Sequence, residues 1–293
     1  MTIKISIVTD EVSADLESAL ELAQTWNLDG VELRGIGGDR YPNLPDYWST
    51  RVPELVAEAG LPVVAISPGL FKIPFPQIPS PSTRILRWED EMFYRRFRDA
   101  ERLARFHLEE LLPASIQAAK DIGSPVIVAF SFDRNENVSA TTPVPQEVID
   151  VLKDAAQKVQ EAGLTLAIEV EHICWGDIGL RTAEIIRKLD NPAAGINWDP
   201  ANAYRAGMDR PFPEDYEAVR NFVRHVHYKD AGTNPETGER GFVFDGEVDW
   251  SGQVAALKRD GYDGYISVET HVRPKIEMAK RSIERLRKLL EEA

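Results

Sequence analysis

The chain has 293 residues, of which 43% are hydrophobic and 28% are charged, and these proportions exclude a disordered or low-complexity chain. Lys and Arg number 34 and Asp and Glu number 48, so the net charge of −14 argues against a large nucleic-acid-binding surface, which needs a basic face. No apolar run approaches the ~18 residues of a membrane span, and the single cysteine, Cys174, excludes an internal disulfide and a zinc site made of cysteines. Residues 1–12 lack the basic start and the long apolar stretch of a secretory signal, so we expect a soluble, cytoplasmic protein.

Short apolar runs alternate with longer amphipathic stretches along the chain. We interpret eight of the runs as strands: 3–8, 30–34, 62–67, 125–131, 164–169, 195–199, 223–229 and 264–269. We interpret eight of the stretches as helices: 13–26, 47–59, 91–122, 146–162, 180–189, 214–222, 250–259 and 274–292. Several of these helices are followed by a glycine just before the next strand, which is typical of a left-handed helix cap that turns the chain back.

Eight strand–helix units in about 290 residues predict a closed (β/α)₈ TIM barrel, formed as a single domain by residues 1–293. The competing open, doubly wound sheet normally carries a Gly-rich turn after its first strand, whereas residues 9–13 contain no glycine. Two insertions, the Pro-rich residues 68–87 and the Gly-containing residues 233–249, follow the third and seventh strands. They leave the end of the barrel where barrel enzymes build their sites, and we interpret them either as lids over a pocket or as surface loops.

Sequence parity separates residues that face the barrel interior from residues that face the helices, because side chains alternate along a strand. On the fifth strand the aliphatic Leu166 and Ile168 share one parity, which places Glu169 on the interior side near the C-terminal end. The same argument on the next three strands places Asp199, His227 and Glu269 at the same mouth of the barrel.

The residues at this mouth indicate a metal site. Three carboxylates cannot lie together at low dielectric without a compensating cation, because their mutual repulsion is costly or forces protonation. One divalent ion would remove that repulsion, and the mixed oxygen and nitrogen donors suit Mn²⁺ first, with Mg²⁺, Co²⁺ or Zn²⁺ as substitutes. The alternative is an internal ion-pair network in which the acids pair with Lys229, Arg34 or Lys4.

Seven short segments carry the motifs of a known family. They are Ser6-Ile7-Val8-Thr9-Asp10-Glu11, Gly30-Val31-Glu32-Leu33-Arg34, Ala167-Ile168-Glu169, Asn197-Trp198-Asp199-Pro200-Ala201-Asn202, His225-Val226-His227-Tyr228-Lys229-Asp230, Gly246-Glu247-Val248-Asp249-Trp250 and Ser267-Val268-Glu269. In this order they resemble the xylose isomerase-like TIM barrels, which include sugar phosphate isomerases and epimerases, keto-sugar epimerases and keto-inositol dehydratases. The resemblance covers nearly the whole chain and implies metal ligation by Glu169, Asp199, His227 and Glu269, the residues that parity selects. It also implies a substrate contact at Asn202, where keto-sugar epimerases tend to have His.

The resemblance implies a metal-dependent isomerase or epimerase of a small sugar, keto-sugar or sugar phosphate. In such a site two substrate oxygens bind the metal, a metal-bound Glu removes a proton from the neighbouring carbon, and a metal-stabilised enediolate forms. We assign Glu169 and Glu269 as the catalytic acid/base pair. Return of the proton from the opposite face gives an epimer and return at the adjacent carbon gives an isomer, and the sequence leaves this choice open.

Four further residues near the mouth are candidates for substrate binding. His172 and Trp175 follow the fifth strand, Lys229 follows His227 by two residues, and His271 continues the interior parity of the eighth strand. Each also has a structural interpretation, as a hydrogen-bonded, charge-neutralising or packed side chain.

Three other functions compete with the isomerase. The nearest is a metal-dependent lyase on the same site, either a keto-inositol dehydratase or a 3-keto-glycoside eliminase. An apurinic endonuclease shares the fold but uses several zinc ions and many histidines, whereas this chain has five histidines and a net charge of −14. A catalytically silent sugar-binding or scaffold protein would not need two interior glutamates. We expect no membrane or nucleic-acid partner, and homo-oligomerisation is left open because the sequence points to no interface.

Overall fold

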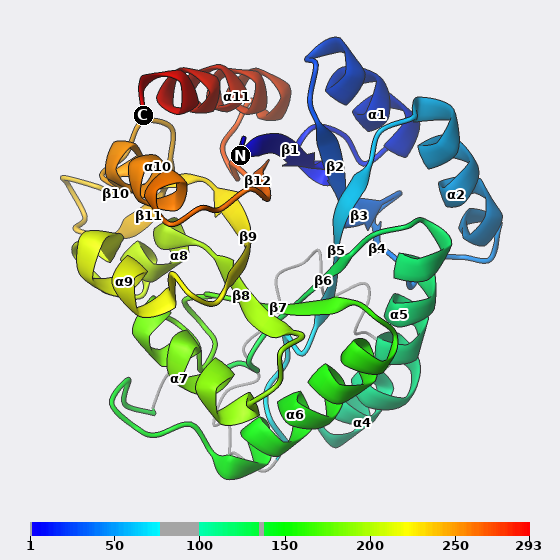
Figure 1. The fold of residues 1–293 in the computed structure, drawn as a ribbon, viewed down its shortest axis with the longest axis horizontal. Coiled ribbons are helices and arrows are strands. Elements are labelled where there is room, and N and C mark those ends of the chain that lie inside the picture. The colour runs from blue at the N-terminus through cyan, green and yellow to red at the C-terminus, as the bar shows by residue number, and fades with distance from the viewer. Residues whose placement is uncertain (1, 77–99, 135–137) are drawn as a thin grey trace.

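The computed structural model describes residues 2–76, 100–134 and 138–293. Its centre is a closed barrel of eight parallel strands surrounded by helices (Figure 1). In chain order the barrel strands are β1 (Lys4–Val8), β2 (Gly30–Leu33), β5 (Val63–Leu70), β6 (Val126–Ala129), β7 (Thr165–Glu169), β8 (Ala194–Trp198), β9 (Val223–Tyr228) and β12 (Tyr265–Val268). The last strand, β12, pairs in parallel with β1 and closes the sheet. The expected (β/α)₈ fold is confirmed.

The outer ring of the described part consists mainly of helices that alternate with the strands. They are α1 (Leu16–Thr25), α2 (Tyr47–Ala59), α4 (Ala100–Phe106), α5 (Leu112–Asp121), α6 (Gln146–Glu161), α7 (Gly179–Leu189), α8 (Pro200–Arg205), α9 (Tyr216–Val219), α10 (Trp250–Arg259) and α11 (Lys275–Glu292). The ring closes where α11 lies beside α1, and there Arg287 donates a hydrogen bond to the backbone carbonyl of Trp26 (Figure 1). None of the described helices combines the length and the apolar character that crossing a bilayer requires.

The expected elements agree with the observed ones, with ends that differ by a few residues. The expected helix 91–122 is observed as α4, a π-helical turn over His107–Leu111 and α5, while residues 91–99 lie outside the described part, as do residues 77–87 of the first insertion. The elements that were not anticipated include α8, the hairpin of β3 (Gly35–Ile36) with β4 (Asp39–Arg40), and the hairpin of β10 (Asp230–Thr233) with β11 (Arg240–Val243).

The core has two parts, which follow from the alternation of side chains along the strands. A small cluster of Val, Ala and Tyr residues, all from barrel strands, includes Ala167 of β7. The larger cluster lies between strands and helices and includes Leu166 and Ile168 of the same strand. The side-chain parity read from the sequence is therefore confirmed on β7, and Glu169 lies on the same side as Ala167.

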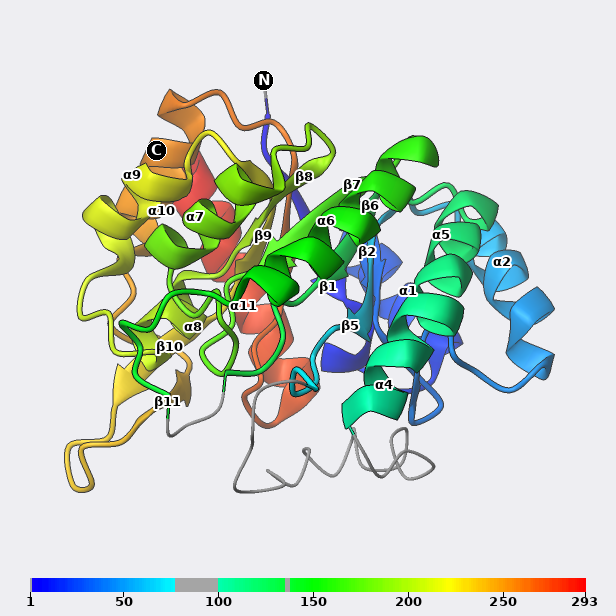
Figure 2. The ribbon, with the colours of Figure 1, turned by 90° about the horizontal axis from the view of Figure 1, so that it is seen from below.

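The second insertion, residues 233–249, lies beyond one end of the barrel. Its β10–β11 hairpin projects past the strands there (Figure 2). The hairpin carries Phe242, which lines the large cavity described below. This position supports the interpretation of the second insertion as a cover over a pocket.

His107, between α4 and α5, predicts a pH dependence of stability. The side chain is buried and its Nδ1 accepts a hydrogen bond of 2.8 Å from the backbone N–H of Phe71. Burial lowers the pKa of His107 to about 3, whereas the ring in the unfolded chain takes up a proton below about pH 6.5. The unfolded state therefore binds the extra proton, and the free energy of unfolding falls as pH drops from 6.5 towards 3.

The variant His107→Asn isolates this effect, because an amide oxygen replaces Nδ1 as acceptor but does not titrate. Urea unfolding of both proteins at pH 7, 6, 5 and 4 gives the comparison. We expect the variant to lose less stability than the parent between pH 6.5 and 4. Parallel curves for the two proteins would show that His107 does not carry the pH dependence.

Candidate metal and active site

Four side chains that the sequence places on interior parity meet at one mouth of the barrel. Glu169 ends β7, Asp199 and Glu269 directly follow β8 and β12, and His227 lies in β9. All four are buried, and each offers one ligand atom within 4.8 Å of the others. Short connections fix them. Asp199 is also the N-cap of α8, where its Oδ1 accepts the backbone N–H of Asn202 at 2.9 Å.

A lysine and an arginine are among the basic side chains that contact these carboxylates. Lys229 Nζ lies 2.7 Å from Asp199 Oδ2 and also pairs with Glu269. Arg34 pairs with Glu269 and with two more carboxylates in the turn after β1. Lys4, the third cation considered from sequence, is exposed and lies over the ring of Tyr265, 5.2 Å from its centroid. Two of the three cations of the ion-pair alternative are therefore present at the site.

A buried nitrogen shows that these residues also suit a divalent ion. Nδ1 of His227 has no hydrogen-bond partner among the described residues. It lies 3.1 Å from Glu269 Oε2 and 3.6 Å from Glu169 Oε1. A buried imidazole nitrogen that faces carboxylate oxygens is the arrangement of a mixed His and carboxylate ligand set. The donor types and their spacing therefore fit a hard or borderline divalent metal.

The electrostatics of the site favour an additional positive charge. Burial raises the pKa of Asp199 to about 6, and the neighbouring carboxylates act in the same direction against the ammonium of Lys229. Burial alone would lower the pKa values of Lys229 and His227, but the surrounding carboxylates outweigh it and hold both above their ordinary values. One carboxylate that resists ionisation beside two strongly retained cations indicates local negative charge around Asp199. At Glu269 the pKa is instead held well below the ordinary range, because Lys229 and His271 outweigh its burial.

A cavity of about 690 Å³ opens onto this site. Among the described residues, thirteen charged side chains line it: Asp10, Glu11, Asp39, Glu169, Glu171, Glu269, Arg34, Arg40, Lys72, Arg205, Lys229, Arg273 and Lys275. Seven of these are cations and six are acids. This near-equal number of cations and acids contrasts with the net charge of −14 of the whole chain. The described wall of the cavity therefore does not repel an anionic ligand as the rest of the surface would.

Three of the five expected substrate-binding residues line the cavity: Asn202, Lys229 and His271. Asn202 Nδ2 donates to Asp199 Oδ2 at 3.0 Å and to Glu169 Oε1 at 3.3 Å. His271 Nε2 lies 3.1 Å from Glu269 Oε1. These contacts place all three beside the candidate ligands.

The other two expected substrate-binding residues lie elsewhere. His172 pairs through Nδ1 with Glu171 Oε1 at 2.5 Å and is not among the described residues that line the cavity. Trp175 is 2% exposed and packs in the main hydrophobic core. The position of Trp175 therefore favours its structural interpretation as a packed side chain, because burial in the core leaves no exposed ring face for a ligand.

Several cavity residues escaped the sequence interpretation. Glu11 Oε1 lies 2.7 Å from Arg34 Nη2, and Glu171 Oε2 lies 2.7 Å from Lys72 Nζ. Glu171 shares the interior parity of Glu169 and could have been selected by it. Phe242 could not, because only the β10–β11 pairing brings it to the cavity.

Comparison with known proteins identifies the family. Residues 20–289 match the sequence profile described as xylose isomerase-like TIM barrel. The chain belongs to this family. Among curated proteins, an uncharacterized protein of Methanocaldococcus jannaschii is 27% identical over 130 residues. That match covers 42% of this chain and 44% of the relative, so it spans less than half of either protein.

Solved structures of xylose isomerase-like barrels share the fold at low identity. An L-ribulose 3-epimerase superposes with a TM-score of 0.72 at 18% identity, covering 99% of this chain and 95% of that one. A probable 3-DHS dehydratase, AsbF of Bacillus anthracis, gives 0.67 at 17% identity, covering 97% and 99%. A xylose isomerase-like TIM barrel protein of Mycobacterium smegmatis in complex with magnesium gives 0.68 at 16% identity, covering 99% and 97%. At these identities the three structures show that the fold is shared.

Proposed function

We propose that this chain is a divalent-metal-dependent isomerase or epimerase of a sugar, keto-sugar or sugar phosphate. One observation carries the proposal: Glu169 and Glu269, from strands β7 and β12, both approach His227 Nδ1 within 3.6 Å at the floor of the large cavity. Two carboxylates beside one metal position can serve as a proton acceptor and a proton donor for the same substrate.

Glu169, Asp199, His227 and Glu269 would hold the ion, with Mn²⁺ as the favoured metal and one ion per chain. The magnesium complex of the mycobacterial structure is consistent with an ion in this fold. When bound, a divalent ion would polarise a substrate carbonyl and make the neighbouring C–H bond more acidic. The proton transfers and the binding of the substrate would be carried out by side chains of this chain.

The two glutamates differ in their surroundings. Glu269 contacts Lys229, Arg34 and His271, which are all cationic or able to carry a proton. Glu169 instead accepts hydrogen bonds from side-chain amides, including that of Asn202 at 3.3 Å. One glutamate removes the substrate proton and the other returns it, and the carbon that receives it decides between an epimer and an isomer.

The cavity wall favours a polar substrate. A neutral sugar would use its hydroxyl groups on the amide of Asn202 and on the carboxylates of the floor. A phosphate or carboxylate group would meet other cations of the wall, such as Arg40, Arg205 and Arg273. The relation to an L-ribulose 3-epimerase is consistent with a keto-sugar, and a test panel should contain both neutral and phosphorylated members.

A metal-dependent lyase is the second candidate function. It is favoured by the two proton donors that contact Glu269, namely Lys229 and His271, because elimination needs an acid to protonate the leaving hydroxyl group. The probable 3-DHS dehydratase shares the fold. Elimination removes water from the substrate, whereas isomerisation conserves its mass.

Deuterium incorporation tests the proposed function. The protein loaded with Mn²⁺ is incubated in D₂O with a panel of ketoses, aldoses and their phosphates, and products are analysed by mass spectrometry and NMR. We expect one deuterium at a carbon next to the carbonyl, dependent on the metal. Loss of water with a new double bond would indicate the lyase. Absence of exchange and of any product across the panel, in protein shown to hold its metal, would contradict both.

A further inference from the structure

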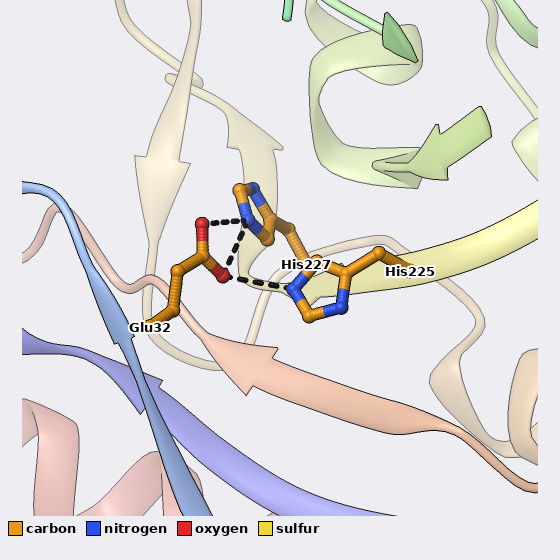
Figure 3. A group of neighbouring side chains, drawn as sticks. All are labelled: Glu32, His225 and His227. Carbon is orange, nitrogen blue, oxygen red and sulfur yellow. Dashed lines mark hydrogen bonds and ion pairs between the residues drawn. The ribbon is translucent and has the colours of Figure 1, made fainter. Parts of the chain in front are cut away.

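A second layer of buried polar residues lies behind His227. Glu32 of β2 is completely buried, and its carboxylate faces two histidines of β9 (Figure 3). His225 Nε2 lies 2.8 Å from Glu32 Oε2, and His227 Nε2 lies 3.1 Å from both carboxylate oxygens. Glu32 therefore contacts the ring nitrogen of His227 that points away from the candidate metal site.

Three neighbouring side chains are already within hydrogen-bond distance of the Glu32 carboxylate. Besides the two imidazoles, the hydroxyl of Ser67 donates to Glu32 Oε1. The second histidine, His225, is also fixed, because its Nε2 lies 3.1 Å from Ser267 Oγ. A carboxylate that accepts from three neighbours acts as an anchor for them. The group of Glu32, His225 and His227 is therefore better explained as hydrogen-bonded support than as a second metal site.

The anchor determines which nitrogen of His227 carries the hydrogen. An ionised carboxylate only accepts hydrogen bonds, so the His227 nitrogen that faces Glu32 is the protonated Nε2. In a neutral ring the lone pair then lies on Nδ1, the nitrogen that faces Glu169 and Glu269. The amide Nδ2 of Asn197 also lies 3.2 Å from His227 Nε2, but as a donor it has an acceptor at 3.4 Å in Glu169 Oε2.

We propose that Glu32 is the positioning residue that holds His227 with Nε2–H towards β2 and with the Nδ1 lone pair towards the metal. The inference rests on the proposed metal site, which it deepens. Histidine ligands commonly donate their other N–H to a carboxylate, and loss of such a partner typically weakens metal binding about 10- to 100-fold. His225 keeps the Glu32 carboxylate in place, so its effect on His227 is directional as well as electrostatic.

The test uses Glu32→Gln, an isosteric change that replaces one acceptor oxygen by an N–H donor. Stripped protein is titrated with Mn²⁺ and with Zn²⁺ by calorimetry, and the tautomer of His227 is read by ¹⁵N–¹H correlation NMR. In the parent we expect a hydrogen on Nε2, which faces Glu32. In Glu32→Gln we expect a 10- to 100-fold larger dissociation constant for the metal. We also expect the ring hydrogen of His227 to shift from Nε2 towards Nδ1.

The matched control is Ser67→Ala, which removes the third donor to Glu32 and leaves both histidine contacts. We expect its metal affinity to stay within about threefold of the parent, since the ligand tautomer is retained. Glu32→Gln that folds and binds metal as tightly as the parent would overturn the proposal. So would a His227 without a hydrogen on Nε2 in the parent, and this measurement decides the matter even if Glu32→Gln does not fold. Parent protein that takes up no metal, with His227 as Nε2–H, would contradict the proposed function alone.

Discussion

The variant Glu269→Gln should lose turnover by about 10³-fold or more while keeping its fold. The amide is almost the same size as the carboxylate, but it cannot accept a proton from carbon and is a poorer metal ligand. The fold should survive because the cations that contact Glu269 keep other partners: Lys229 retains Asp199 at 2.7 Å, and Arg34 retains Asp10 at 2.8 Å.

The matching control is Glu54→Gln on α2, the same chemical change on an exposed side chain that pairs with Arg51 at 3.4 Å. It should leave turnover within twofold of the parent. Initial rates with the substrate identified by deuterium exchange, together with circular dichroism and the melting temperature, give the comparison. Near-normal turnover in a folded Glu269→Gln protein would exclude the mechanism that uses two glutamates.

The variant Lys229→Met should be strongly destabilised when no metal is present and should recover stability when a divalent ion is added. Lys229 is buried between Asp199 and Glu269, and its removal leaves carboxylates without their nearest ammonium. Removing one partner of a buried ion pair costs about 3–5 kcal/mol, which lowers the melting temperature by on the order of 10 °C in a protein of this size. A bound divalent ion supplies the missing charge.

Lys72→Met is the control for this prediction. Lys72 lines the same cavity and pairs with Glu171 at 2.7 Å, outside the four candidate ligands. Its loss should lower stability equally with and without metal. Thermal unfolding of the three proteins after chelation and after addition of Mn²⁺ makes the comparison. If metal does not stabilise Lys229→Met more than it stabilises the parent, the buried carboxylates are explained by the ion-pair network and not by a metal site.

The barrel could be predicted from sequence because its signals are local and repeated. Each strand is a short apolar run, and Gly60, Gly123, Gly163 and Gly261 adopt positive φ angles at helix ends, as expected there. The positions of Glu169, Asp199, His227 and Glu269 followed from side-chain alternation alone. The short helix α8 was missed although Asp199 and Pro200 are a typical N-cap and first residue, because six residues give no hydrophobic period.

The part of the cavity wall formed by Phe242 and Arg205 could not be predicted, because it depends on contacts between distant segments. Phe242 reaches the cavity through the pairing of β10 with β11, and Arg205 packs on its ring at 4.3 Å from the centroid. Alternation along a strand also cannot show how deep a residue lies. Lys4 shares the interior parity of β1 but lies at its exposed beginning, where its ammonium lies over the ring of Tyr265.

Trp175 shows a related limit of sequence reasoning. An aromatic residue in a loop after a barrel strand suits a sugar platform as well as it suits packing. In the structure its backbone N–H donates to the carbonyl of Phe132 at 3.0 Å, and the ring is buried in the core. Which of two chemically reasonable roles such a residue takes is decided by the path of the loop.

The central claim is that a divalent ion is held by Glu169, Asp199, His227 and Glu269, and metal content per chain tests it most directly. Elemental mass spectrometry is applied to protein purified without chelator, and again after stripping and reloading. The account predicts about one divalent ion per chain, removed by the chelator and regained on reloading, and a much lower content in Asp199→Asn. Protein that holds no metal and takes up none on reloading would contradict the account and would leave the buried carboxylates explained by Lys229 and Arg34 alone.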